Sequence, residues 1–299
     1  TNNESTNPRI TTYPMPTLRK LFYTLPPAWR FLARRLYYLP ADLYEGLSGK
    51  RDAMTPPRGL IYTGSGDFRA QGEKMRQYLI ELAGLQPGHR VLDVGSGIGR
   101  IAVPLTEYLN EKGSYEGFDV VEVGVRWCEK TITHRYPNFH FTYVDLDNDL
   151  YRSGGGSAAD FRFPYADEDF DLVVLTSVFT HMLPDEVANY LREIRRVLRP
   201  GGRCFATFFL WNEEAARLSR SNPHFTFPHD RGHYRLMDEQ VQSANVAFGE
   251  EYLRREMIAG AGLEVEQAHY GYWAGREKAG CKDFQDVLVL KRGRGANRA

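Results

Sequence analysis

From residue 69 onward, the chain alternates between stretches with helical spacing of apolar positions and short apolar runs typical of strands. The spacing predicts helices near 69–84, 98–111, 122–135, 185–198 and 249–260. The apolar runs predict strands at Arg90–Val94, Tyr115–Phe118, Phe139–Val144, Phe170–Leu175, Arg203–Leu210, Leu263–Ala268 and Asp286–Leu290. Such alternation indicates βαβ units, and therefore an α/β fold with a doubly wound, mainly parallel sheet that carries helices on both faces.

Residues 1–68 follow a different pattern, rich in proline and aromatic residues, and are expected to form a helical N-terminal extension or lid. A helix is predicted over Ala28–Leu39, because Pro27 suits its first turn and Pro40 is expected to end it. Its apolar positions share one face, namely Trp29, Leu32, Leu36 and Leu39. We expect this helix to pack on the body of the protein; a lid over a site and a helix on a membrane surface are the alternatives.

Charge and cysteine content narrow the function classes. The 299 residues include 42% hydrophobic residues, enough for a sizeable core, and 38 basic and 38 acidic side chains that cancel. Because nucleic-acid binding needs a basic excess, no nucleic-acid partner is expected. A local basic excess in residues 1–60 leaves contact with a membrane surface open but not favoured.

The cellular compartment is predicted from what the sequence lacks. It contains three widely separated cysteines, no run of 18 apolar residues and no apolar segment at its start that would indicate a signal peptide. We therefore expect a reducing, cytoplasmic compartment, and neither a disulfide framework nor a zinc site.

A glycine-rich turn, VLDVGSGIGR at residues 91–100, links the first predicted strand to the next helix. A dinucleotide-binding fingerprint would place its third glycine where this chain has Arg100, which disfavours a nicotinamide-dependent oxidoreductase. The pattern is instead an acid, Asp93, two residues before a GxGxG run. With it, residues 88–210 resemble the class I S-adenosylmethionine-dependent methyltransferases of the small-molecule type, and the similarity continues more weakly to about residue 290.

The resemblance implies a seven-stranded, Rossmann-like methyltransferase domain over residues 69–292, with S-adenosylmethionine as cofactor and S-adenosylhomocysteine as product. It places the glycine turn and its acid near the methionine part of the cofactor, through Asp93, Gly95, Ser96, Gly97 and Gly99. It also implies that Asp119, followed by Val120, ends the second strand and accepts hydrogen bonds from the ribose hydroxyls.

Further cofactor contacts follow from the same resemblance. Adenine is expected to bind at either Asp145 or Asp160, and in the second case also at the backbone N–H of Phe161. The unusual spacing over 146–159 leaves both positions open, and we favour Asp160. Thr176 and Ser177, after the fourth strand, are expected to flank the cofactor. Phe68, which precedes the first helix of the domain, is expected to close over it.

The sequence does not show motifs that mark other acceptors of this fold. No Asn-Pro-Pro-aromatic run follows the fourth strand, no Pro-Cys nucleophile occurs, and Thr176 and Ser177 stand where magnesium-dependent members carry an acid. Metal-independent O-methylation of a small molecule, such as a sugar, a phenol or another secondary metabolite, is therefore expected. N- or C-methylation and a non-catalytic cofactor-binding subunit remain alternatives, and the oligomeric state is not predicted.

A hydroxyl acceptor needs a general base, and histidines are the candidates. His181 follows the fourth strand by six residues; capping or packing at a helix start is its alternative role. His229 and His233 could pair with Asp230 in an insertion at about 211–248, which is expected to shape the acceptor pocket. A solvated loop is the alternative for this insertion.

Overall fold

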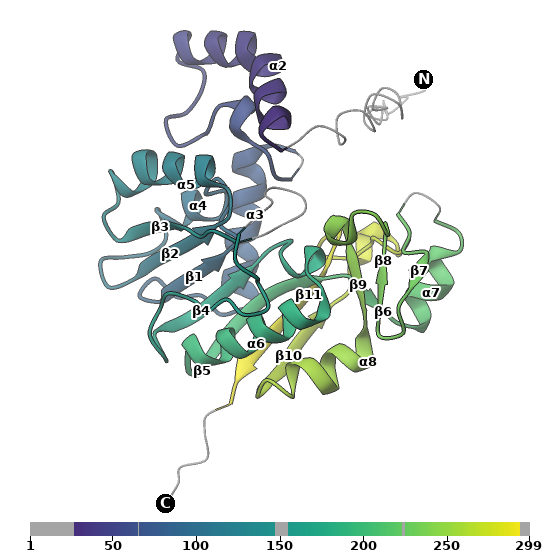
Figure 1. Cartoon of the computed structure of the whole chain (residues 1–299). Coiled ribbons are helices and arrows are strands. Elements are labelled where there is room, and N and C mark those ends of the chain that lie inside the picture. The colour runs from purple at the N-terminus through teal and green to yellow at the C-terminus, as the bar shows by residue number, and fades with distance from the viewer. Residues whose placement is uncertain (1–26, 65, 147–154, 223–224, 294–299) are drawn as a thin grey trace, which may run out of the picture.

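The computed structural model of the chain describes residues 27–64, 66–146, 155–222 and 225–293 (Figure 1). Its main sheet has seven strands in the order β10-β11-β5-β4-β1-β2-β3. In chain order they are β1 (Arg90–Val94), β2 (Ser114–Asp119), β3 (Phe139–Tyr143), β4 (Phe170–Leu175), β5 (Leu198–Phe208), β10 (Leu263–His269) and β11 (Asp286–Arg292). Only β11 runs antiparallel to its neighbours within this sheet, which confirms the doubly wound, mainly parallel prediction.

Helices cover both faces of the sheet because consecutive strand residues point to opposite sides. On one face, Val91 and Tyr115 pack with α3 (Phe68–Glu81), α4 (Ala102–Leu105) and α5 (Glu122–Cys128). On the other, Leu92 and Phe118 pack with α6 (Pro184–Val197) and with the segment that continues α8 (Glu250–Tyr252) to Ile258. The strand order reverses between β1 and β4, and such a switch point opens a crevice at the carboxyl ends of the strands.

Two predicted helices have different bounds. The helix expected near 98–111 is reduced to α4, because Pro104 has no N–H to continue the ladder of hydrogen bonds. The N-terminal helix α2 (Pro27–Leu47) continues through Pro40, so the prediction that Pro40 ends it was wrong. Leu36 and Pro40 are both exposed, and water can therefore reach the Leu36 carbonyl that Pro40 leaves without a donor.

The insertion after β5 folds into a second sheet, in the order β6-β9-β8-β7. Its strands are β6 (Leu210–Trp211), β7 (His229–Asp230), β8 (Tyr234–Leu236) and β9 (Val246–Gly249), and α7 (Glu213–Ser219) accompanies them (Figure 1). This sheet has a small core of its own, formed by Phe209, Ala215, Phe227, Ala247, Trp273 and Ala274. The insertion is therefore a folded unit and not a solvated loop.

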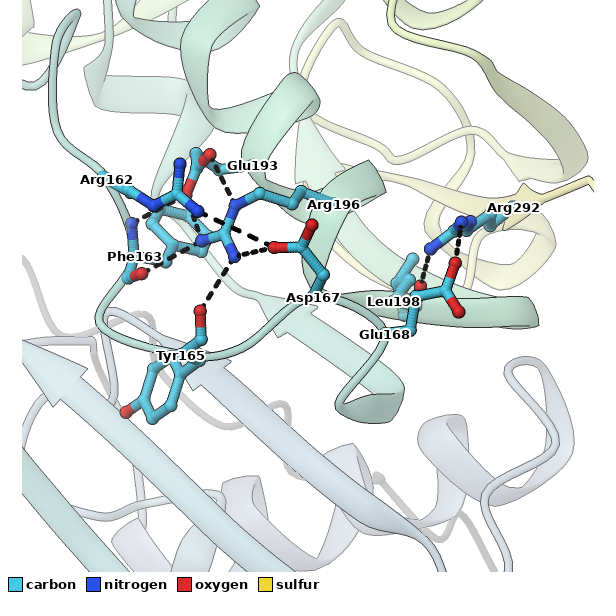
Figure 2. Close-up of polar contacts among 9 residues, drawn as sticks. All are labelled: Arg162, Phe163, Tyr165, Asp167, Glu168, Glu193, Arg196, Leu198 and Arg292. Carbon is cyan, nitrogen blue, oxygen red and sulfur yellow. Dashed lines mark hydrogen bonds and ion pairs between the residues drawn. The ribbon is translucent and has the colours of Figure 1, made fainter.

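The segment before β4 is fastened to α6 by Arg196 (Figure 2). The Arg196 guanidinium donates to the carbonyls of Phe163 (3.0 Å) and Tyr165 (2.8 Å) and pairs with Glu193 (2.6 Å) and Asp167 (2.8 Å). These contacts hold residues 163–167 along the last turns of α6, from where the chain leads into the first residue of β4.

Within the described ranges, no helix is both long enough and apolar enough to cross a membrane.

Candidate active site

A cavity of about 790 Å³ lies at the carboxyl ends of β1, β2 and β4. Its wall is formed by Asp93 and the glycine turn, by Asp119 and Val120 after β2, and by Thr176 and Ser177 after β4. The cavity is thus at the switch point of the sheet, where ligands of doubly wound folds bind, and it has the volume of a typical ligand site.

Three glycines of the turn adopt the left-handed conformation, with φ angles of 78° at Gly95, 58° at Gly97 and 75° at Gly99. A Cβ on Gly95 would lie 2.6 Å from Val178 Cγ2, so a side chain there would collide with the loop after β4. Gly95 and Gly97 line the cavity. Gly99 does not; a Cβ there would lie 2.9 Å from Cys128 Sγ, so this glycine allows close packing of α5.

Asp93 is 1% exposed, and one of its oxygens has no protein partner. Oδ2 accepts a hydrogen bond from the Tyr115 hydroxyl at 2.5 Å, whereas Oδ1 accepts none. Burial raises the pKa of Asp93 to about 7, partly opposed by the Tyr115 hydrogen bond. The Ser96 hydroxyl in the same wall is also buried without a partner among the described residues, so both atoms fit the polar end of a ligand.

Asp119 is oriented by the turn that it faces. Its Oδ2 accepts from the N–H of Gly97 at 2.8 Å and its Oδ1 from the N–H of Val121 at 2.8 Å, and the Tyr62 hydroxyl also hydrogen-bonds to it. Burial raises the pKa of Asp119 to about 6, although these hydrogen bonds act in the opposite direction. A carboxylate has about four acceptor positions, and these three donors occupy three of them, so Asp119 can accept from a further hydroxyl of a ligand, and from two only if the Tyr62 hydroxyl is displaced.

Besides Gly99, four of the expected cofactor contacts are not part of the cavity wall. Asp145 and Asp160 are exposed, and the N–H of Phe161 points to the Ala158 carbonyl at 3.5 Å. Phe68 is buried under Arg100 and faces a smaller cavity of about 290 Å³. The wall does include Leu146, Ala158 and Tyr190, side chains that the sequence argument did not single out. Residues 147–154, next to Asp145, lie outside the described part of the chain.

Ser177, which lines the cavity after β4, has an unusual backbone conformation. Its φ of 57° lies in the left-handed region, which is rare for a residue with a side chain and typical of functional sites. The conformation is fixed by hydrogen bonds from its N–H to Thr207 Oγ1 (2.7 Å) and from its hydroxyl to Gln285 Oε1 (3.0 Å). Thr207 and Gln285 also line the cavity, so two strands hold this end in place.

His181 lies in the cavity wall, and its tautomer is set by the insertion. Its Nδ1 is 2.8 Å from the carbonyl oxygen of Ser243, and because a carbonyl can only accept, Nδ1 carries the proton. Burial lowers the pKa of the imidazole below its ordinary value, which favours the neutral ring. Nε2 of the neutral ring then has a lone pair that can accept a proton.

The other expected bases are engaged in the second sheet and lie outside the cavity wall. His229 pairs with Glu239 at 3.3 Å, Asp230 pairs with Arg235, and His233 stacks on Tyr252 with ring centroids 4.2 Å apart. The structure therefore does not assemble these three residues into an acceptor site. Residues 223–224 of the same segment lie outside the described chain.

Some lining residues gave no recognisable signal in the sequence. Ser243 and Gln285 reach the cavity only through the folding of distant segments. Arg100, noted in the sequence only because it breaks a dinucleotide fingerprint, donates to the Thr63 carbonyl at 2.5 Å, and burial lowers its pKa. In the described residues, no group of three or more His, Cys, Asp and Glu side chains is placed to hold a metal ion.

Part of the chain is similar to known methyltransferases. Residues 92–206 match a family model described as a methyltransferase domain. A methyltransferase named GfsG from Streptomyces halstedii is 32% identical over 140 residues, which are 44% of this chain and 42% of that protein. A protein named ubiquinone/menaquinone biosynthesis C-methyltransferase UbiE, from Azotobacter vinelandii, is 23% identical over 65% of this chain and 73% of its own length.

The fold is also found among solved structures. A crystal structure of a protein from Pyrococcus horikoshii matches with a TM-score of 0.53 and 18% identity, covering 78% of this chain and 94% of that one.

The alignment with the Streptomyces relative spans only about two fifths of that protein's length. Residues 92–206, which contain Asp93, the glycine turn and Asp119 of the cavity wall, thus match a methyltransferase domain.

Proposed function

We propose that the chain transfers the methyl group of S-adenosylmethionine to an oxygen atom of a small molecule, with His181 as general base. The observation that carries this proposal is the hydrogen bond from His181 Nδ1 to the Ser243 carbonyl, which leaves Nε2 unprotonated in a residue that lines the cavity. A buried imidazole with a lowered pKa is neutral at physiological pH, as a base must be.

The residues of the cavity fit the cofactor. The cofactor supplies a methyl group already activated on a sulfonium sulfur. Asp93 Oδ1 and the Ser96 hydroxyl, which have no partners in the described chain, would bind its amino-acid end, and Asp119 would accept from a ribose hydroxyl. Gly95 and Gly97 leave room for its close approach, because a side chain on Gly95 would already collide with Val178.

The acceptor would lie between Ser177 and His181. Both residues line the cavity, and Ser177 is held by Thr207 and Gln285. As the acceptor oxygen forms its bond to the methyl carbon and the carbon–sulfur bond breaks, the hydroxyl proton passes to His181 Nε2. The remaining contribution of the protein is alignment of the two reactants, because displacement requires an in-line approach.

C-methylation is the alternative that a specific observation favours. The Azotobacter vinelandii relative, aligned over 73% of its length, is named as a C-methyltransferase. On this alternative, a carbon nucleophile replaces the hydroxyl in the same cavity, and His181 would take a proton from carbon or from a neighbouring hydroxyl. Identification of the methylated product distinguishes the two.

The test is the substitution His181→Asn in enzyme with a methyl acceptor found by screening. The Asn amide can still donate to the Ser243 carbonyl but cannot take up a proton at neutral pH, so turnover should fall by about 10²–10⁴-fold while cofactor affinity stays unchanged. Turnover of the wild type should also decline on the acid side of pH 6.5, because the pKa of His181 lies below its ordinary value.

Kinetics across a pH series and calorimetric titration with S-adenosylhomocysteine provide these measurements. Unchanged turnover in His181→Asn would remove the base from the proposal. Failure of the wild type to bind either form of the cofactor would contradict methyl transfer itself.

A further inference from the structure

Exposed apolar side chains are concentrated on α2. Among the described residues, nine large apolar side chains are exposed, and eight of them belong to this helix. They are Trp29, Leu32, Leu36, Tyr37, Leu39, Leu43, Tyr44 and Leu47, with exposed fractions from 46% to 88%. The ninth is Val241 in the insertion. A contiguous apolar patch on a protein surface marks a site of contact with another molecule or with a membrane.

Figure 1 shows α2 at one end of the molecule, and its acidic side chains contact the segment that follows the helix, residues 51–59. Asp42 accepts from the backbone N–H groups of Arg58 (2.7 Å) and Gly59 (3.0 Å), and Glu45 pairs with the Arg58 side chain at 2.5 Å. The outward stripe consists of Trp29, Leu32, Leu36, Leu39, Leu43 and Leu47. Because these residues are spaced by three or four positions, they form a continuous apolar face along the helix.

The charges of α2 determine what can cover this stripe. Its two acidic residues, Asp42 and Glu45, are both paired with arginines of the following segment, Asp42 with Arg51 at 3.5 Å. Between residues 27 and 41 the helix contains Arg30, Arg34 and Arg35 and no acidic residue. The exposed face is therefore apolar and flanked by the exposed Arg35 and the half-buried Arg30 and Arg34, a basic flank that complements an anionic surface and would repel the same face of a second copy.

The patch also contains three exposed aromatic side chains that carry a polar group. Trp29 is 60% exposed, Tyr37 77% and Tyr44 59%, and each combines an apolar ring with a polar tip. Such side chains are favoured at the boundary between water and lipid.

We propose that α2 lies flat on a lipid bilayer rich in anionic headgroups, with its leucine stripe inserted and its arginines near the phosphates. The proposal does not depend on methyl transfer. It also places the active site close to the bilayer, because Phe31 of α2 contacts Tyr62, with ring centroids 5.5 Å apart, and Tyr62 lines the cavity.

The test is co-sedimentation of the full chain with vesicles. We expect binding to phosphatidylcholine vesicles that contain about 30% phosphatidylglycerol, weaker binding to pure phosphatidylcholine, and partial loss of binding in about 0.5 M salt. The double substitution Leu36→Glu/Leu43→Glu should weaken binding at least about tenfold, because two exposed leucines no longer enter the lipid. Val241→Glu, the same kind of change at the exposed apolar residue outside α2, should leave binding unchanged.

Thermal unfolding and cofactor titration establish that the variants are folded, which is expected because the substituted side chains point to solvent. Equal binding of wild type and the double variant to anionic vesicles would overturn the proposal. The proposal would also be overturned if the wild type did not bind to vesicles at all. Light scattering would then show whether the wild type is a dimer that the double substitution dissociates. In that case a second copy, and not lipid, covers the stripe.

Discussion

At the scale of single residues, the cavity combines carboxylates that are costly to ionise with atoms that lack partners. Asp93 and Asp119 are both buried in the free protein, and their mutual repulsion adds to the raised pKa of Asp93. A cationic ligand would offset this cost by stabilising both carboxylates. Ligand affinity and protonation are therefore linked in this cavity.

Affinity for S-adenosylmethionine should accordingly rise with pH. Bound cofactor would lower the pKa values of Asp93, about 7 in the free protein, and of Asp119, about 6, so protons are released on binding. Between about pH 5.5 and 7.5 we expect a gain in affinity of at least about tenfold, and Asp93→Asn should remove the part of this dependence that belongs to Asp93. Calorimetry in buffers of different ionisation enthalpy measures both effects, and an affinity that does not vary over this range would contradict the assignment.

The sequence predicted those cavity residues that have a reactive or hydrogen-bonding side chain and also lie near the end of a strand. Asp93 and Asp119 lie at the carboxyl ends of β1 and β2, and His181 follows β4 by six residues, so the ends of the strands specify where their side chains lie. Ser243 could not be predicted, because only its backbone carbonyl is used and any residue type supplies one. His229 and His233 were misleading for the opposite reason: their side chains suit catalysis, but Glu239 and Tyr252 already engage them.

At the scale of elements, helix bounds were predicted well where the apolar spacing was uninterrupted. For α3 and α6 the predicted and observed bounds differ by a few residues at most. For α4 and α2 the predicted and observed bounds differ more, and both helices contain a proline. Whether a proline ends a helix depends on what surrounds the carbonyl that loses its donor, and the pattern of apolar residues does not contain that information. The exposure of the apolar face of α2 was likewise not predicted, since spacing identifies a face but not its partner.

The contact between α6 and the segment before β4 should contribute strongly to stability. Arg196 and Glu193 are 14% and 12% exposed, and Arg196→Ala would leave two backbone carbonyls without their donor and Glu193 without its cationic partner, with only the Phe163 N–H still donating to it (Figure 2). We expect a loss of about 3 kcal/mol in the free energy of unfolding. The control Arg199→Ala removes a 45%-exposed partner of Asp171 and should cost at most about 1 kcal/mol. Denaturant titration compares the two, and equal losses would refute the special role of Arg196.

At the scale of the whole molecule, Asp286 connects the main sheet to the insertion. Its carboxylate at the start of β11 accepts from the N–H of Leu210 (2.7 Å), the N–H of Gly271 (2.7 Å) and Trp273 Nε1 (2.7 Å). These donors come from the first strand of the second sheet and from its small core. One side chain thus satisfies three buried donors at the junction of the two sheets.

Substitution of Asp286 by Asn should loosen this junction. An amide nitrogen cannot accept, so at least one of the three donors loses its partner, at a cost of about 2 kcal/mol. Hydrogen exchange should accelerate in residues 210–249 more than in β1 and β4. Glu214→Gln, which changes a 49%-exposed partner of Arg276, serves as control and should leave exchange unaltered. Uniform acceleration across both sheets would show that the junction is not where the insertion is held.

The separate core of the insertion has an evolutionary consequence. Phe209, Phe227 and Trp273 bury one another on one side of the second sheet, whereas Leu236, Val246 and Phe248 pack into the core of the main sheet. The insertion reaches the cavity through Ser243, whose carbonyl accepts from His181 Nδ1. On the proposed function, a lineage could therefore vary the side of this module that has its own core, and with it the methyl acceptor, while the side that packs on the main sheet and the Ser243 carbonyl are kept.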